Sequence, residues 1–230
     1  MDFDGTITKK DIGDELFIVF GKFEPYHSQL IECKINITDY WHNLCNNLND
    51  DVSEDTIVSY AETCGVNPYF IEFANYCKKE NVALAIVSDG FESYIKPILK
   101  REKLDWIPVF CNKLIFSEGE KPKPIFPNAS EVCKCLSASC KRNLILSNSP
   151  PEAIIIFIGD GYSDYCPAEH SDIIFAKNAL AKYCNENKIP HYSYNTFFEV
   201  LRIMQLNVQK NKFKVRNQAK LLRKKAFEIE

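Results

Sequence analysis

The chain has 230 residues, of which 46% are hydrophobic and 26% are charged, with a formal net charge of −3 at pH 7. This composition excludes an intrinsically disordered protein, and the length suits one large domain or a core with a smaller second domain. No apolar run approaches the ~18 residues of a membrane span and no secretory signal is present, so we expect a cytoplasmic protein without a membrane partner.

Two aspartates, Asp2 and Asp4, open the chain in the segment DFDGTIT. Residues i and i+2 of an extended segment point the same way, so both carboxylates face one site. Such a pair can bind Mg²⁺, and one carboxylate can attack phosphorus while the other transfers a proton. Gly5 allows the backbone to turn directly behind them.

Residues 10–66 are rich in helix-forming and aromatic residues and contain no convincing strand. Ser53, at the start of the segment SEDTIV, is typical of a helix N-cap. We interpret residues 10–66 as a small helical insert.

Residues 67–206 alternate between helical and strand-like sequence. The predicted strands are apolar runs, as in a parallel sheet covered on both faces, and they are Val82–Val87, Val109–Cys111, Ile154–Ile158 and Asp172–Phe175. The predicted helices are Asn67–Glu80, Tyr94–Glu102 and Cys140–Leu146. This alternation predicts a doubly wound, mostly parallel α/β core. Residues 109–126 predict a β-hairpin flap, and the basic tail, residues 207–230, predicts a solvated terminal helix.

Three further segments carry groups suited to phosphate and metal. The Ser88-Asp89-Gly90 triplet follows the first predicted strand, where a hydroxyl and free N–H groups make an anion site. Lys141 is a point positive charge suited to phosphate. Asp160 and Asp164 follow the strand Ile154–Ile158 and suggest a metal site. Because ligands of open α/β sheets bind at the carboxyl ends of the strands, these groups are expected to converge.

The chain resembles the haloacid dehalogenase superfamily of phosphatases over residues 1–206. The resemblance lies in four motifs, namely DFDGTIT, IVSDG, Lys141 and FIGDGYSD. The resemblance implies a Rossmann-like core of residues 1–9 and 67–206, with residues 10–66 as a helical cap like that of phosphoserine phosphatases. It implies that Asp2 is the nucleophile, forming an aspartyl-phosphate, and that Asp4 is the general acid and then the general base.

The resemblance also implies the remaining site residues and the reaction. The phosphoryl group would bind to Ser88, Asp89, Gly90 and Lys141. Mg²⁺ would bind to Asp2, the backbone carbonyl of Asp4, Asp160 and Asp164. The expected activity is Mg²⁺-dependent hydrolysis of a small phosphorylated metabolite, and no nucleic-acid partner is expected because the body of the chain is acidic.

Two phosphatase groups share further segments with this chain. The similarity to phosphoethanolamine/phosphocholine phosphatases lies in the segments VCKCLSASCKRNLI and GDGYSDYCPA. The resemblance to 2-hydroxy-3-keto-5-methylthiopentenyl-1-phosphate phosphatases lies in IVSDGFESYIKPIL and IFAKNALAKYCNENKIPHYSY. Phosphoserine is disfavoured, because Thr38 and Asp39 stand where phosphoserine phosphatases would align the arginine that binds the substrate carboxylate. A cap without that cation suits an amine or a neutral tail.

Ten cysteines are scattered along the chain. We expect reduced thiols, because no secretory signal accompanies them. The alternative to reduced thiols is a zinc site, formed by Cys133, Cys135 and Cys140 with Cys111 or a histidine. The Cys-x-Cys spacing is tighter than the usual Cys-x₂₋₄-Cys, and this favours thiols over metal.

Only Met1 precedes Asp2, where the phosphatase family has an apolar central strand. A missing strand predicts a gap in the sheet between the strands that carry Ser88 and Asp160. We therefore expect a truncated form of a longer phosphatase. The alternatives are a catalytically inactive relative that serves as a binding or regulatory protein, and a phosphotransferase or pyrophosphatase on the same scaffold.

Overall fold

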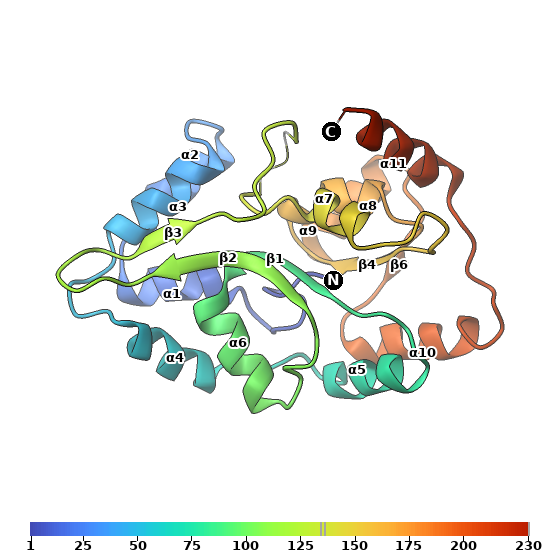
Figure 1. The fold of residues 1–230 in the computed structure, drawn as a ribbon, viewed down its shortest axis with the longest axis horizontal. Coiled ribbons are helices and arrows are strands. Elements are labelled where there is room, and N and C mark those ends of the chain that lie inside the picture. Colours follow the sequence, from blue (N-terminus) through green and yellow to red (C-terminus); the bar gives the residue numbers. More distant parts are fainter. Residues whose placement is uncertain (134, 136, 230) are drawn as a thin grey trace.

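The computed structural model describes residues 1–133, 135 and 137–229, and these residues form an α/β fold (Figure 1). Its strands are β1 (Ile86–Phe91), β2 (Val109–Ile115), β3 (Lys123–Ile125), β4 (Ile156–Gly159), β5 (Ile173–Ala176) and β6 (Tyr192–Ser193). They make two three-stranded sheets, in the orders β1–β2–β3 and β4–β5–β6. All pairs are parallel except β2 with β3, so the predicted mostly parallel α/β fold and the predicted hairpin are confirmed.

The described helices alternate with these strands after a helical segment near the start. They are α1 (Ile12–Phe20), α2 (Tyr26–Ile31), α3 (Ile37–Asn46), α4 (Glu54–Thr63), α5 (Phe70–Lys79), α6 (Glu92–Arg101), α7 (Lys141–Ser147), η1 (Tyr162–Asp164), α8 (Tyr165–Glu169), α9 (Asn178–Glu186), α10 (Phe197–Asn207) and α11 (Asn217–Ile229). Ser53 caps α4 as predicted, because its side chain accepts a hydrogen bond from the backbone of Thr56.

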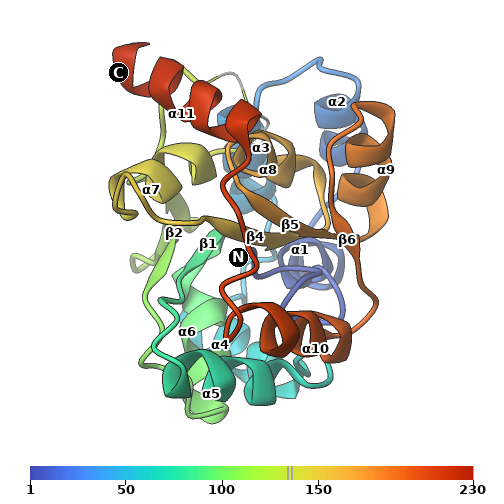
Figure 2. The same ribbon diagram turned by 90° about the vertical axis from the view of Figure 1, so that its right-hand side faces the viewer.

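The first residues of the chain lie between the two sheets (Figure 2). The Met1 amino group donates to the carbonyl of Ala85 at 2.9 Å, and Val87 N–H donates to the carbonyl of Met1 at 2.8 Å. On the other side, Asp2 N–H donates to the carbonyl of Ile158 at 2.9 Å. Two residues thus join β1 to β4 and partly fill the position of the expected central strand.

An apolar cavity of about 510 Å³ continues from Met1 on the amino side of the sheets. Its walls include residues 82–85, which lead into β1, and residues 154–158 of the β4 region. The prediction that strands begin at Val82 and Ile154 was wrong, since β1 begins at Ile86 and β4 at Ile156. Strand pairing requires a neighbouring backbone, and on this side the neighbouring backbone begins at Met1.

Helices cover both faces of the sheets, with α5 and α10 on one face and α7 and α8 on the other (Figures 1 and 2). Side chains of a strand point alternately to the two faces. In β4, Ile158 therefore packs in the hydrophobic cluster that contains Phe70 and Phe197, while Phe157 packs in the cluster that contains Leu180. Because side chains on both faces are packed, the strands are held in place, and the loops that leave their carboxyl ends are held in position as well.

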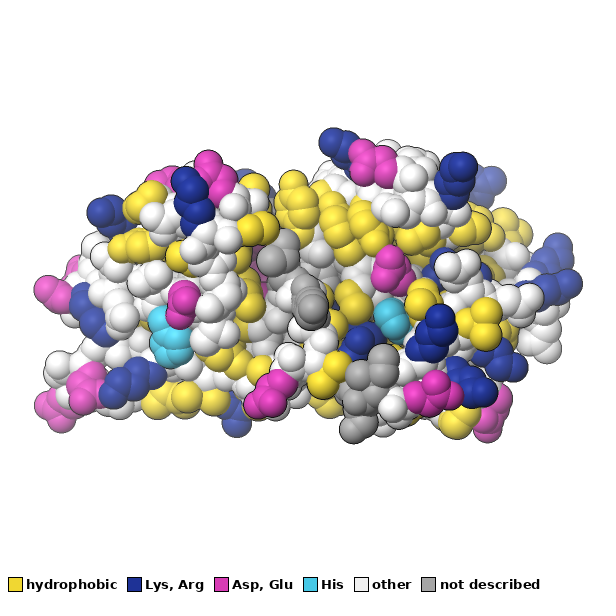
Figure 3. All heavy atoms as spheres, turned by 90° about the horizontal axis from the view of Figure 1, so that it is seen from above, with side chains coloured by type: hydrophobic (Ala, Val, Ile, Leu, Met, Phe, Trp, Pro, Cys, Tyr) yellow, Lys and Arg dark blue, Asp and Glu magenta, His cyan; other side chains and the backbone are white. Residues whose placement is uncertain are grey.

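The basic tail packs onto the fold through two arginines. Arg216 donates to the carbonyls of Ala168 and Ser171, both at 3.0 Å. The buried Arg223 of α11 donates to the carbonyl of His170 at 2.7 Å and forms an ion pair with Asp172 at 3.2 Å. In the view from above, basic side chains at the right are interspersed with acidic and hydrophobic ones (Figure 3). No described helix is both long and apolar enough to cross a membrane.

We expect Arg223→Ala to release α11 from the fold. The substitution leaves the carboxylate of Asp172 buried without that ion pair, which typically costs about 3–5 kcal/mol. Hydrogen exchange of the α11 amides should accelerate strongly, with little change in β4 or β5. Arg202→Ala, at an exposed position of α10, is the control. Unchanged exchange in α11 would show that Arg223 does not anchor this helix.

Candidate active site

A lysine and three carboxylates converge where β4 and the first residues of the chain end. The Nζ atom of Lys141, at the start of α7, lies 2.7 Å from Asp2 Oδ1 and 2.7 Å from Asp164 Oδ1. It also donates to Ser163 Oγ at 2.9 Å. Lys141 is 1% exposed, so this predicted phosphate-binding lysine lies inside the fold.

The surroundings favour the charged form of Lys141 but disfavour the charged forms of Asp2 and Asp160. Burial lowers the pKa of Lys141, but its ion pairs with Asp164 and Asp2 outweigh burial and hold the pKa above its usual range. Burial and repulsion by Asp164 raise the pKa of Asp2, and the same two causes raise that of Asp160. A further cation beside these carboxylates would relieve their repulsion.

The three carboxylates fit a hard divalent cation. Ligand oxygens of Asp2, Asp160 and Asp164 lie within 4.8 Å of one another, and oxygen is the ligand that Mg²⁺ prefers. Thr6 Oγ1 donates to Asp160 Oδ1 at 2.7 Å and orients that carboxylate. Asp164 Oδ2 accepts from the N–H groups of Asp160 and Gly161, at 2.8 and 3.0 Å, and thereby fixes the loop after β4.

The carboxylate of Asp4 accepts hydrogen bonds from groups outside this carboxylate cluster. Its Oδ2 accepts a hydrogen bond from Tyr94 Oη at 2.7 Å, and its Oδ1 accepts from Ile12 N–H at 3.1 Å. Burial and the charge of Asp11 raise the pKa of Asp4 to about 8. A raised pKa suits this side chain to holding and donating a proton.

The Ser88-Asp89-Gly90 triplet lies within β1, rather than after it as predicted, at an irregularity in the pairing with β2 between Val87 and Phe91. Ser88 is buried, and its Oγ accepts from Gly90 N–H at 3.0 Å. Asp89 binds protein groups with its carboxylate: Oδ1 accepts from Ser139 N–H at 2.7 Å. Asp89 therefore positions the loop before α7.

A cavity of about 200 Å³ brings the predicted site residues together. Its lining includes Asp2, Asp4, Ser88, Asp89, Gly90, Lys141 and Asp160. The helical segment contributes further lining residues, which include Asp11, Asp14, His27, Leu30, Ile37, Tyr40 and Trp41. Asp164 is fully buried beside the cavity and holds Lys141. The cavity thus offers a phosphate-sized group a place next to Asp4, the buried Lys141 and the carboxylate cluster.

Sequence reasoning missed the residues that orient the two leading aspartates. Tyr94 donates to Asp4, although the two residues are 90 positions apart. Ser163 contacts Lys141, and Thr6 orients Asp160. Tyr94 follows Gly90 by four residues and lies in the first turn of α6, and this closeness to the triplet is the one local signal that could have indicated it.

We expect Gly90→Ala to impair the site more than the fold. A Cβ atom at this position would clash with Tyr94 Oη and lie 2.6 Å from Asp4 Oδ2, so the Tyr94–Asp4 hydrogen bond must break. Phosphatase kcat should fall by roughly 10²-fold, since small displacements of a catalytic acid are costly. Gly65→Ala is the matched control, because nothing lies within 4 Å of its added Cβ. Equal activity of the two variants would contradict this packing.

Comparison with known proteins gives one consistent result. The family model for haloacid dehalogenase-like hydrolases matches residues 1–169. The chain is 33% identical to a 2-hydroxy-3-keto-5-methylthiopentenyl-1-phosphate phosphatase of Brevibacillus brevis over 89% of this chain and 93% of that protein. It is 28% identical to the enzyme of the same name from Lysinibacillus sphaericus, over 91% and 94% of the two chains.

Solved structures agree at the level of the fold. A phosphoserine phosphatase solved as a phospho-aspartyl intermediate analogue superposes with a TM-score of 0.65 at 19% identity, covering 88% of this chain and 95% of that one. A substrate-bound phosphoserine phosphatase gives a TM-score of 0.63 over the same shares. The predicted fold and the predicted enzyme class, a hydrolase of the phosphatase type, are thereby confirmed. The chain belongs to the haloacid dehalogenase-like hydrolase family.

Proposed function

We propose that this enzyme is a Mg²⁺-dependent phosphatase that hydrolyses a small phosphomonoester through an aspartyl-phosphate on Asp2. The observation that carries the proposal is the buried Lys141, whose Nζ lies 2.7 Å from both Asp2 and Asp164 in the cavity that also contains Asp4. Phosphoryl transfer depends on positioning and on neutralising the phosphoryl oxygens, and this cluster offers both.

The proposed reaction has two steps. In the first, a carboxylate oxygen of Asp2 attacks phosphorus, the bond from phosphorus to the substrate oxygen breaks, and Asp4 gives its proton to the leaving alkoxide. In the second, Asp4 takes a proton from water, the water oxygen attacks phosphorus, and the bond to Asp2 breaks to release phosphate. Tyr94 and the Ile12 N–H orient Asp4 for both transfers.

Asp2, Asp160 and the backbone carbonyl of Asp4 would hold Mg²⁺, with Asp164 beside them. The ion would supply positive charge that neutralises the phosphoryl oxygens and reduces their repulsion with Asp2. Lys141 and Ser88 would bind the remaining phosphoryl oxygens, and Asp89 and Gly90 would contribute backbone.

The favoured substrate has an uncharged, partly apolar tail. The curated relatives reported above are named as phosphatases of 2-hydroxy-3-keto-5-methylthiopentenyl-1-phosphate. The helical segment gives the cavity apolar lining residues, namely Leu30, Ile31 and Ile37, and Trp41 adds an aromatic ring. We propose that residues 10–66 act as a cap whose apolar lining receives such a tail and excludes water.

A second candidate is a substrate with an ammonium head group, such as phosphoethanolamine or phosphocholine. Asp11 and Asp14 line the same side of the cavity as Tyr40 and Trp41. Burial and the charge of Asp14 raise the pKa of Asp11 to about 7, and burial and the charge of Asp4 raise that of Asp14 to about 6. A bound cation would stabilise both carboxylates, and the aromatic rings would add cation–π attraction.

Phosphate release with and without Mg²⁺ tests the proposal. The panel contains 2-hydroxy-3-keto-5-methylthiopentenyl-1-phosphate, phosphoethanolamine, phosphocholine, phosphoserine, pyrophosphate and an aryl phosphate. We expect Mg²⁺-dependent turnover, highest for the methylthio substrate and lowest for phosphoserine, since Lys141 is the one lysine or arginine among the described residues that line the cavity.

The alternatives give different results in the same assay. Preference for phosphoethanolamine or phosphocholine, lost in Asp14→Asn but kept in Asp39→Asn, would select the ammonium substrates. Hydrolysis of pyrophosphate and of no phosphomonoester in the panel would overturn the proposal that the enzyme is a phosphomonoesterase. Absence of turnover from folded protein with every substrate would favour the binding or regulatory protein.

A further inference from the structure

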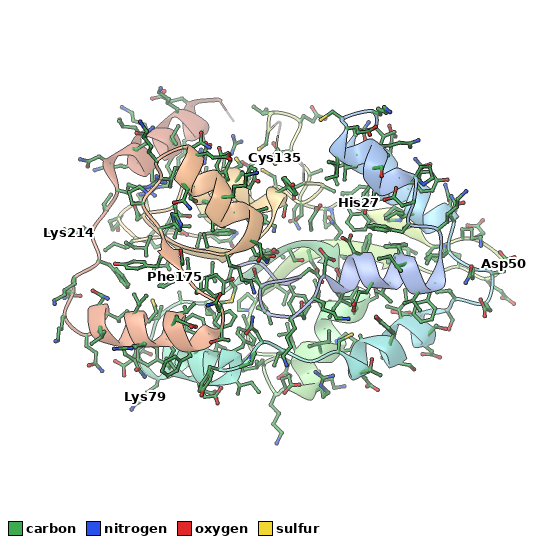
Figure 4. The ribbon with its side chains drawn as sticks, turned by 180° about the vertical axis from the view of Figure 1, so that it is seen from behind. His27, Asp50, Lys79, Cys135, Phe175 and Lys214 are labelled. Atoms are coloured by element: carbon green, nitrogen blue, oxygen red, sulfur yellow. The ribbon has the colours of Figure 1, made fainter. Side chains whose placement is uncertain are left out.

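Four cysteines from distant parts of the sequence meet beside α7 and α8. Cys133 and Cys135 lie in the loop before α7, where Figure 4 labels Cys135, and Cys140 is the N-cap of α7. Cys166 lies in α8. Cys133 Sγ is 3.2 Å from Cys135 Sγ and 3.7 Å from Cys166 Sγ, and the sulfurs of Cys133, Cys135 and Cys140 all lie within 4.8 Å of one another.

One of the two printed sulfur–sulfur distances agrees with a tetrahedral metal site, and the other is shorter. Zinc–sulfur bonds of about 2.3 Å in a tetrahedron place the sulfurs about 3.8 Å apart. The separation of 3.7 Å between Cys133 and Cys166 agrees with this value, and that of 3.2 Å between Cys133 and Cys135 needs a shift of about 0.6 Å. The sequence alternative of Cys111 or a histidine as fourth ligand is replaced by Cys166, 26 positions beyond Cys140.

The cysteines of this group are available as metal ligands, because all ten cysteines of the chain are free thiols. Thiolates are soft ligands, which select zinc over magnesium, whereas the carboxylates around Lys141 are hard. The two clusters therefore suit different metals.

We propose that Cys133, Cys135, Cys140 and Cys166 bind one structural Zn²⁺, with loss of their thiol protons. The ion ties the loop before α7 to α8. Cys140 directly precedes Lys141, and Cys166 follows Asp164 by two residues, so the ion fixes both segments that form the Lys141–Asp164 ion pair. The Ser139 N–H bond to Asp89 belongs to the same loop.

Metal analysis of the purified chain tests the site directly. We expect about one zinc per chain, retained after dialysis against EDTA under conditions that remove Mg²⁺. The variant Cys166→Ser should lose most of the zinc, whereas Cys33→Ser, at an exposed free thiol, should keep it. Asp160→Asn should also keep it, because the carboxylate cluster is a separate site.

Cobalt substitution gives a readout that does not depend on a variant. Co²⁺ bound by four thiolates shows intense sulfur-to-cobalt charge-transfer bands and tetrahedral d–d bands. With metal bound, a thiol reagent should react with about six of the ten cysteines of the folded chain at most, and with four more once the metal is removed. Folded wild-type protein that binds neither Zn²⁺ nor Co²⁺ under anaerobic, reducing conditions would overturn the proposal. Iron in place of zinc, or a disulfide between Cys133 and Cys135 in the freshly purified chain, would overturn it as well.

Discussion

Replacing Asp2 by asparagine is expected to abolish phosphate release and to leave the chain folded. The amide cannot attack phosphorus, so kcat should fall by roughly four orders of magnitude or more, as when other enzymes lose a nucleophile. Lys141 keeps its ion pair with Asp164 in this variant, so no unpaired ammonium group is left in the fold. The loss of activity should therefore not reflect unfolding.

The stability of the Asp2→Asn variant carries separate information. Asp2 lies buried beside Asp160 and Asp164, and its pKa is raised by burial and by Asp164. Removing one of three crowded carboxylates should leave the melting temperature unchanged or raise it in the absence of Mg²⁺. Saturating Mg²⁺ at 100 times its dissociation constant stabilises a protein by about 2.7 kcal/mol, and this gain should shrink in the variant.

Thermal melts and single-turnover assays with and without Mg²⁺ measure these effects. Asp105→Asn, at an exposed position, is the control and should behave as the wild type. Retention of more than about a tenth of the wild-type rate by Asp2→Asn would exclude the aspartyl-phosphate. Equal Mg²⁺-induced shifts in the two variants would instead place the metal away from Asp2.

The sequence was sufficient for the groups whose chemistry and position are both local. Asp2, Asp160 and Ser88 could be proposed because carboxylates and a hydroxyl close to strand ends are visible in short segments, and the three residues line one cavity. A single lysine carries no specific local signal, so Lys141 could be singled out only as a positive charge suited to phosphate, and the resemblance assigned it to the site. Its burial depends on Asp2, which is 139 residues away along the chain.

Contacts across long stretches of chain account for what the sequence did not indicate. Folding brings Tyr94 to Asp4 and Cys166 to Cys133. No residue pattern within the separate segments indicates either contact. The apolar run from Val82 was interpreted as strand from its composition, but a strand also needs a partner backbone. Residues 82–85 instead line the cavity beside Met1.

Adding an extended apolar segment before Met1 is the second change with a large expected effect. Four residues such as Val-Ile-Val-Ile would enter the cavity of about 510 Å³ and continue the pairing that Met1 begins with Ala85 and Val87. Each buried side chain contributes about 1.5–3 kcal/mol, against a backbone ordering cost of about 1–2 kcal/mol per residue. We expect the free energy of unfolding to rise by roughly 2–4 kcal/mol.

The charge at Met1 adds to this effect. Met1 is buried, and burial lowers the pKa of its amino group to about 6. In the extended chain that nitrogen becomes a neutral amide, so folding no longer has to desolvate or deprotonate an amine that is charged in the unfolded chain, while the donor to Ala85 remains. A stability gain of this size in a chain of 230 residues corresponds to a melting temperature roughly 5–15 °C higher.

A Gly-Ser-Gly-Ser extension of equal length separates the two contributions. It also removes the charge from the Met1 nitrogen but has no apolar side chains, so it should recover only the electrostatic part of the gain. Equal melting temperatures for the two extensions would show that the cavity does not accept a strand. Because Asp2 follows Met1 directly, an apolar strand that fixes Met1 between β1 and β4 should also hold the nucleophile more rigidly, and kcat should rise with stability.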